Sequence, residues 1–418
     1  MGRELFARIV RVKMFADFEE ILPDYKKAAG NMAENGPQGA DTLIVRRCQD
    51  RISPPFLHRR SRDMRIKRVL SQLLALVMAV SLTACGSAPG KEKSAVVNVY
   101  NWGEYIDESI FDRFEDETGI KVRYTTYSDN ETMYATLMNG SANYDVIIPS
   151  DYMISRLINE EALEELNFDH IPNYANIDQE YRNREYDPEN LYSVPYMWGV
   201  VGVVYNTKMV EGTPDSWDIL WDEHLKGQIL MFDNSRDALA IALSRMGCSL
   251  NTTHGQKLSA AMNMLEEQKP LVQAYVMDQI FDKMEASEAA VGPYYAGDAV
   301  TMMADNPDLS FFFPKEGSNY YVDAMCIPKG AKNKENAEAF INFMCEPEIM
   351  KANAEVTNYS LPSSADRALL DEEMRENPYI YPDESVLQNT EVFVNLPQNT
   401  LELYDKLWMD LKASTETN

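Results

Sequence analysis

Apolar positions between residues 96 and 148 follow strand and helix periods in alternation. A β-branched run begins at Val96, and the apolar residues that follow from Ile110 recur at helical spacing. The pattern predicts, in chain order, a strand at 96–100, a helix at 108–117, a strand at 120–124, a helix from its cap at Asn130 to Gly140, and a strand at 145–148. This order is typical of an α/β sheet with parallel crossovers.

The remainder of the chain carries a second set of elements. Its pattern predicts a Pro- and aromatic-rich stretch at 194–205, helices at 236–246 and 259–267, a strand at 320–327 and an amphipathic helix at 333–345. The 418 residues exceed one ordinary domain, so two or three globular units are expected. The order of elements does not by itself show whether the chain crosses between these units.

Charge separates the two ends of the chain and excludes one class of partner. Of 39 basic and 66 acidic side chains, 15 and 9 lie in residues 1–85, which leaves 24 and 57 for residues 86–418, a net charge of −33. Such an acidic body repels phosphate backbones, so we expect no nucleic acid partner. A cationic ligand is favoured, although solubility alone also explains an acidic surface. Four scattered histidines and five cysteines without CxxC spacing predict no metal centre, redox motif or cofactor.

A targeting signal lies inside the chain. A basic stretch from Met64 precedes twelve apolar-rich residues, too few to span a bilayer, and Leu-Thr-Ala-Cys then ends at Cys85. This tetrad resembles the lipobox of bacterial lipoproteins, in which the cysteine is acylated and becomes the mature N-terminus. We therefore expect residues 1–63 to be a leader outside the mature protein, 64–84 a lipoprotein signal peptide, and 85–95 a lipidated cysteine with a flexible tether.

These features predict an extracytoplasmic body that is anchored to the bacterial cell membrane through Cys85, on its periplasmic side or outer face. The body then carries three further cysteines, Cys248, Cys326 and Cys345. Three thiols leave one unpaired, and we expect no essential disulfide among them.

Carboxylates or hydroxyls stand within or directly after aromatic residues in five segments of the body, one of which directly follows Phe232. These are Tyr100 to Tyr105, Ser150 to Tyr152, Asp233 to Asp237, Tyr294 to Asp298, and Tyr320 to Asp323. An ammonium ion is attracted to the face of Trp or Tyr and pairs with a carboxylate, so this combination suits a linear polyamine. A single such cluster is also typical of a hydrogen-bonded surface pair. The first two clusters, however, directly follow predicted strands, and open α/β sheets bind ligands at those carboxyl ends.

Longer stretches resemble the substrate-binding proteins of bacterial spermidine/putrescine ABC transporters. They are Tyr100-Asn-Trp-Gly-Glu-Tyr105, Glu117-Thr-Gly-Ile-Lys-Val122, Ser128-Asp-Asn-Glu-Thr-Met-Tyr134, Tyr144-Asp-Val-Ile-Ile-Pro-Ser150, Val194-Pro-Tyr-Met-Trp-Gly199, Phe313-Pro-Lys-Glu-Gly317 and Ala331-Lys-Asn-Lys-Glu335. The resemblance covers nearly all of residues 96–418. It implies a two-lobed α/β, periplasmic-binding-protein-like fold with crossing hinge strands and a ligand cleft between the lobes. The N-terminal lobe is expected to comprise 96–204 plus 322–368, and the C-terminal lobe 205–321 plus 369–418.

The resemblance also implies which side chains bind the ligand. They are Trp102, Glu104, Tyr105, Ser150, Tyr152, Asn234, Asp237, Tyr295, Asp298, Tyr321, Asp323 and Tyr359. Two positions depart from the family. Asn234 stands where spermidine-type members often carry Asp, and Phe393 stands near a position where some carry Gln. With one charge fewer at that end, we expect a shorter diamine or a different pose.

The resemblance therefore predicts a monomeric protein that captures putrescine, spermidine or both and delivers them to the permease subunits of an ABC importer, whose ATPase lies in the cytoplasm. Ferric iron is an alternative ligand, because the adjacent phenols of Tyr294 and Tyr295 suit a hard cation. A carboxylate-based hydrolase is a further alternative. The body lacks the common nucleotide, zinc-protease and serine-hydrolase motifs, and we expect no enzyme.

Overall fold

The computed structural model describes residues 95–140 and 143–414, and its first half confirms the predicted alternation. In chain order it contains β1 (Ala95–Trp102), α3 (Ile110–Thr118), β2 (Ile120–Tyr127), α4 (Asn130–Met138), β3 (Val146–Ile147) and α5 (Asp151–Asn159). β1 pairs in parallel with both β2 and β3, which gives the order β2-β1-β3. The predicted cap of α4 was wrong: Asp129 caps it instead of Asn130, because the Asp129 carboxylate accepts the Thr132 N–H at 2.7 Å.

The second half has its own parallel strands with helices between them. Its elements are β5 (Ile229–Phe232), α6 (Ser235–Arg245), α7 (Gly255–Gln268), β6 (Val272–Val276), α8 (Gln279–Glu285), β7 (Val291–Tyr295), α9 (Ala296–Asp305) and β8 (Leu309–Phe312). β5 pairs in parallel with β6 on one side and β7 on the other. The predicted helices at 236–246 and 259–267 correspond to α6 and α7.

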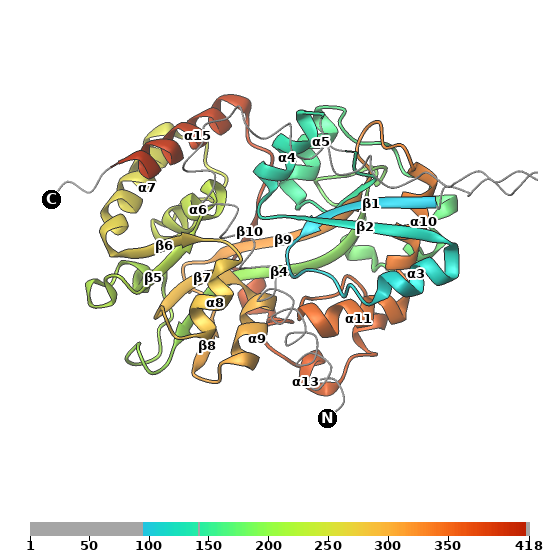
Figure 1. Ribbon diagram of the computed structural model, residues 1–418. Helices are drawn as coiled ribbons and strands as arrows, with labels where there is room; N and C mark the ends of the chain where they lie inside the picture. Colours follow the sequence, from blue (N-terminus) through green and yellow to red (C-terminus); the bar gives the residue numbers. More distant parts are fainter. Residues whose placement is uncertain (1–94, 141–142, 415–418) are drawn as a thin grey trace, which may run out of the picture. The chain divides into compact units, whose positions relative to one another are not determined.

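Two long strands run between these halves and join them into one 10-stranded sheet, as Figure 1 shows. β4 (Ser193–Asn206) is buried along its whole length, and β9 (Ser318–Cys326) lies antiparallel to it. β4 pairs with β9 up to Val200 and with β7 from Val201 onward. The sheet order is β2-β1-β3-β9-β4-β7-β5-β6, with β8 on β4 and β10 (Thr390–Val392) on β9. The ends of β4 therefore belong to different halves of the structure.

The later helices return to both halves. They are α10 (Lys334–Met344), α11 (Pro347–Thr357), α12 (Ser364–Arg367), α13 (Glu372–Arg375), α14 (Glu384–Leu387) and α15 (Gln398–Ala413). α10 packs on β1, and α15 packs on α6 and α7. The predicted lobe borders fall inside strands: the border at 204/205 lies within β4 and the border at 321/322 within β9. The exact extent of each lobe therefore stays a prediction.

The leader, the signal peptide and the lipidated Cys85 lie outside the described residues. Within those residues, Cys248, Cys326 and Cys345 are free thiols. No helix within the described residues has the length and apolar character that a bilayer crossing requires.

Candidate ligand-binding site

A cavity of about 620 Å³, counting open solvent at its mouth, lies where β1, β3 and β9 meet the helices of the second half. Eleven of the twelve residues that the sequence singled out line it. They are Trp102, Tyr105, Ser150, Tyr152, Asn234, Asp237, Tyr295, Asp298, Tyr321, Asp323 and Tyr359. Glu104 is not among the lining residues: it is exposed next to the mouth, with a left-handed φ of 47°. The structure thus brings together residues that are up to 257 positions apart.

The strands of the first half supply one wall of the cavity. Trp102 ends β1, and its indole N–H donates to the Ile148 carbonyl at 2.8 Å, which fixes the ring. Asn319, Tyr321 and Asp323 all face the cavity because alternate residues of β9 point to the same side of the sheet. One of the two strands that cross between the halves therefore carries part of the site.

The second half supplies one carboxylate after each of its three parallel strands. Asp237 lies in the first turn of α6, which follows β5, and Asp298 in the first turn of α9, which follows β7. Asp278 is the residue before α8, which follows β6. All three line the cavity, and helix N-termini stabilise negative charge. The carboxyl ends of this sheet therefore form an acidic wall.

Asp323 holds the most deeply buried unsatisfied charge of the site. Its side chain is 4% exposed, and Oδ2 accepts the Tyr105 hydroxyl at 2.8 Å. Oδ1 is buried and has no hydrogen-bond partner within the described part of the chain. Burial raises the pKa of this carboxyl to about 6, against hydrogen bonds that favour its charged form. A buried acceptor without a partner is unfavourable, and a donor from a ligand would satisfy it.

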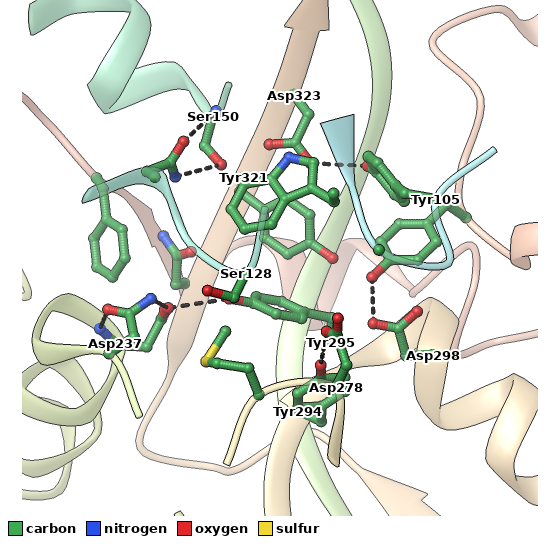
Figure 2. A pocket seen from close by; sticks show the side chains of 18 of the residues that line it. Tyr105, Ser128, Ser150, Asp237, Asp278, Tyr294, Tyr295, Asp298, Tyr321 and Asp323 are labelled. Carbon is green, nitrogen blue, oxygen red and sulfur yellow. Dashed lines mark hydrogen bonds between the residues drawn. The ribbon is translucent and has the colours of Figure 1, made fainter. Parts of the chain in front are cut away.

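Two further carboxylates are each held by a phenol. The Tyr359 hydroxyl donates to Asp298 at 2.8 Å, and the Tyr295 hydroxyl donates to Asp237 at 3.1 Å. Burial raises the pKa of Asp237 to about 6 and that of Asp298 well above its usual value. Figure 2 shows Asp237 on one side of the aromatic rings, with Asp298 and Asp278 on the other. The acidic groups thus flank the aromatic centre.

Asn234 caps α6 and supports Asp237, a role that could not be recognised from the residue type alone. It caps α6, because its Oδ1 accepts the N–H groups of Arg236 and Asp237. Its Nδ2 donates to Asp237 at 2.7 Å. The amide therefore supports the neighbouring carboxylate, where an Asp would oppose it.

Several lining residues were missed by the sequence analysis. They are Gly103, Ser128, Asn130, Asp151, Met277, Asp278, Tyr294 and Asn319, and Phe393 was considered only as a departure from the family. Asp278 was missed because neither a predicted strand end nor the family resemblance indicated it, whereas the resemblance indicated Asp237 and Asp298 although β5 and β7 were not predicted either. Asp151 has a structural partner: its carboxylate accepts the Val322 N–H at 3.1 Å, between Tyr321 and Asp323 on β9.

The composition of the lining favours a cation. The lining includes five Asp and eight aromatic residues. Within the part of the chain that the structure describes, no Lys, Arg or His lines the cavity. Arg236 is not among the lining residues but stacks on two of them: its guanidinium carbon lies 4.6 Å from the ring centroid of Phe393 and 5.4 Å from that of Tyr152. Buried carboxylates with raised pKa values gain most when a positive charge enters beside them. A ligand with ammonium groups and an apolar chain meets both requirements.

The tyrosine pair proposed for ferric iron is used differently. Tyr294 donates to Asp278 at 3.3 Å and Tyr295 donates to Asp237. Burial and these carboxylates raise the pKa of both phenols well above the usual value, which opposes the phenolate that iron would require. Among the residues described, no group of three or more His, Cys, Asp and Glu side chains is placed to hold a metal ion. The geometry does not favour the iron alternative.

Comparisons with known proteins agree with this geometry. The family model described as a bacterial extracellular solute-binding protein matches residues 109–381. The spermidine/putrescine-binding periplasmic protein of Escherichia coli is 33% identical over 340 residues, which cover 81% of this chain and 97% of that protein. A putative spermidine/putrescine ABC transporter protein from Listeria monocytogenes is 40% identical, with a TM-score of 0.74 over 77% of this chain and 99% of that one.

A second solved relative is the spermidine/putrescine ABC transporter substrate-binding protein PotD of Streptococcus pneumoniae. It is 38% identical, with a TM-score of 0.66 over 76% of this chain and 99% of that one. These relatives are binding proteins of transport systems, and their structures confirm the predicted two-lobed α/β fold with a cleft between the lobes. With its match over residues 109–381, the chain belongs to the family of bacterial extracellular solute-binding proteins.

Proposed function

We propose that the protein captures polyamines, putrescine or spermidine or both, outside the cytoplasm and delivers them to an ABC importer. The observation that carries this proposal is the buried Asp323, which lines the cavity and whose Oδ1 has no partner in the described residues. An ammonium group supplies the missing donor and the missing charge together.

The arrangement of the other groups supports an elongated ligand with charge at both ends. Asp237 lies on one side of the rings of Tyr295 and Tyr321, and Asp298 on the other (Figure 2). The hydroxyls of Tyr295 and Tyr359 already donate to Asp237 and Asp298, so the faces of these rings remain free to contact a methylene chain. A neutral sugar would leave the carboxylates unpaired, and an amino acid would bring its own carboxylate against them.

The relatives support the identity of the ligand and the transport role. Proteins at 33% and 30% identity, from Escherichia coli and Pseudomonas aeruginosa, are named for spermidine/putrescine and for putrescine. By this likeness the partners are the permease subunits of an importer, and the chain binds its ligand as a monomer without chemical conversion. The extracytoplasmic body is held at the membrane by acylated Cys85, after removal of the signal peptide at residues 64–84.

Titration calorimetry on the body from Ser94 tests the proposal. Putrescine or spermidine should give a saturable isotherm, whereas maltose and leucine should give no heat of binding. The released ligand, identified by native mass spectrometry of protein purified from its host, should be a polyamine. A sugar isotherm with silent polyamines would overturn the proposal. A visible absorption band that a chelator removes would instead support iron.

A further inference from the structure

We propose that Asp278 is an additional recognition residue, which binds a terminal ammonium of the ligand at the mouth of the cavity when the two halves close. This inference rests on the proposed polyamine function and deepens it, since it assigns one end of the ligand to a residue that the family resemblance did not indicate. Three observations support it: the orientation of the Asp278 side chain, its fit against Gly103, and the charges around it.

The carboxylate of Asp278 is turned away from its own helix. Asp278 occupies the N-cap of α8 with a helical backbone, φ −56° and ψ −18°, whereas a capping Asp usually has an extended backbone and accepts a backbone N–H of the first turn. Its carboxylate makes no such bond within the described residues. Instead, Oδ1 accepts the Tyr294 hydroxyl at 3.3 Å, and the side chain lines the cavity. The carboxylate is thus directed to the ligand site and away from its own helix.

Gly103 provides space for this carboxylate from the opposite half. A Cβ built on Gly103 would lie 2.5 Å from Oδ2 of Asp278, closer than real contacts allow, and 3.3 Å from its Cγ, so the carboxylate would have to turn aside. Gly103 follows β1 in the first half, whereas Asp278 follows β6 in the second. The close approach therefore joins the halves at the cavity mouth, and it depends on the absence of a side chain at position 103.

Asp278 lies among other negatively charged groups, and this arrangement favours a bound cation. Asp278 is an exposed residue, but partial burial of its carboxyl group together with the charge of Glu104 raises its pKa, while the Tyr294 hydroxyl opposes the rise. Asp298 lies on the same side of the cavity in Figure 2. Bringing these carboxylates together is unfavourable without a positive charge between them.

A terminal ammonium has the matching chemistry. It carries three N–H donors, which acceptors from different elements can share. Asp278 and Asp298 offer carboxylate oxygens from the starts of α8 and α9. A ligand that ends in a hydroxyl or a carboxylate would leave this end of the site unneutralised. Asp278 thus selects for a cationic terminus.

The first test compares two substitutions that remove one negative charge from the same region. Asp278→Asn should weaken putrescine binding about tenfold, or about 1.4 kcal/mol, because the charged acceptor for one N–H donor of the ammonium is lost at an exposed position. Asp282→Asn, at an exposed position of α8, should change it less than twofold. Calorimetry at physiological salt measures both, and thermal melts verify that the variants are folded.

The second test couples Asp278 with Gly103. Gly103→Ala should weaken putrescine binding in the wild-type background, because the new Cβ displaces the carboxylate. In an Asp278→Ala background the same change should have little effect. Equal effects in both backgrounds, or an Asp278→Asn affinity within twofold of wild type, overturn the role of Asp278 while leaving polyamine binding intact. A wild-type protein that binds no polyamine overturns both proposals.

Discussion

Replacing Asp323 with Asn separates recognition in the cavity from attraction by the acidic surface. The substitution keeps the shape of a side chain that is 4% exposed, and Asn can still accept the Tyr105 hydroxyl. It removes the charge opposite a desolvated ammonium. At pH 7.5 the Asp323 carboxyl group, whose pKa is about 6, is mostly ionised. Deprotonation before ligand binding therefore costs the wild-type protein little free energy.

The expected loss is large. Breaking a buried ion pair by removing one partner costs about 3–5 kcal/mol, which corresponds to an affinity loss of about 100-fold or more. Glu384→Gln is the matched control, because Glu384 is exposed at the start of α14 and loses the same unit of charge. The control should lose less than about fivefold, since exposed charges interact weakly and are screened by salt.

Calorimetric dissociation constants for putrescine and spermidine, at low and physiological salt, decide between the two explanations. The difference between the variants should persist at physiological salt, because the buried site excludes mobile ions. If Asp323→Asn and Glu384→Gln lose equal affinity, general charge attraction accounts for binding and the cavity is not the site.

Four further changes probe other features. Asn234→Asp replaces the amide that donates to Asp237 with a like charge, so it should raise the affinity ratio of spermidine to putrescine in calorimetry by adding a cation partner at that end. Gly297→Ala would place a Cβ 2.4 Å from the Tyr359 ring, and melts and titrations should show lower stability and weaker binding. Because burial raises the pKa of Asp237 to about 6, putrescine should bind more weakly at pH 5 than at pH 7.5. The unliganded protein should show the opposite trend, since stability from a raised carboxyl pKa is present at low pH and is lost as pH rises through about 6; melts with and without putrescine at both pH values test the two signs. Cys85→Ala should abolish incorporation of labelled fatty acid, and label that persists in the variant would contradict the lipobox interpretation.

The sequence predicted the order of elements in the first half well because each depends on local patterns, whereas the second-half strands β5, β6, β7 and β8 were not predicted. The β-branched run before Trp102 and the helical spacing after it need no distant partner, and both elements formed as expected. The cap of α4 was misplaced by one residue, since Asp129 and Asn130 are both good capping residues and only geometry separates them. Short β6 was missed because its five residues are mostly half-buried and lack a strong apolar pattern.

The site was predicted through family resemblance more than through residue patterns. Resemblance placed eleven of its twelve residues around one cavity, but it could not show the roles of individual side chains. Asn234 had been considered a lost charge, and the structure shows a helix cap that also supports Asp237. Contacts between distant segments, such as Gly103 against Asp278, depend on how the halves approach, and no local pattern encodes them.

The placement of Asn319, Tyr321 and Asp323 on one face of β9 constrains how this protein can diversify. An insertion or deletion within the strand would turn Tyr321 and Asp323 away and present Val322 and Ala324 to the ligand, because the side-chain period is two. The strand also pairs with β4 along most of its length. New ligand preferences should therefore arise by substitution, and most readily at the starts of α6, α8 and α9, where a carboxylate can be exchanged without altering strand pairing.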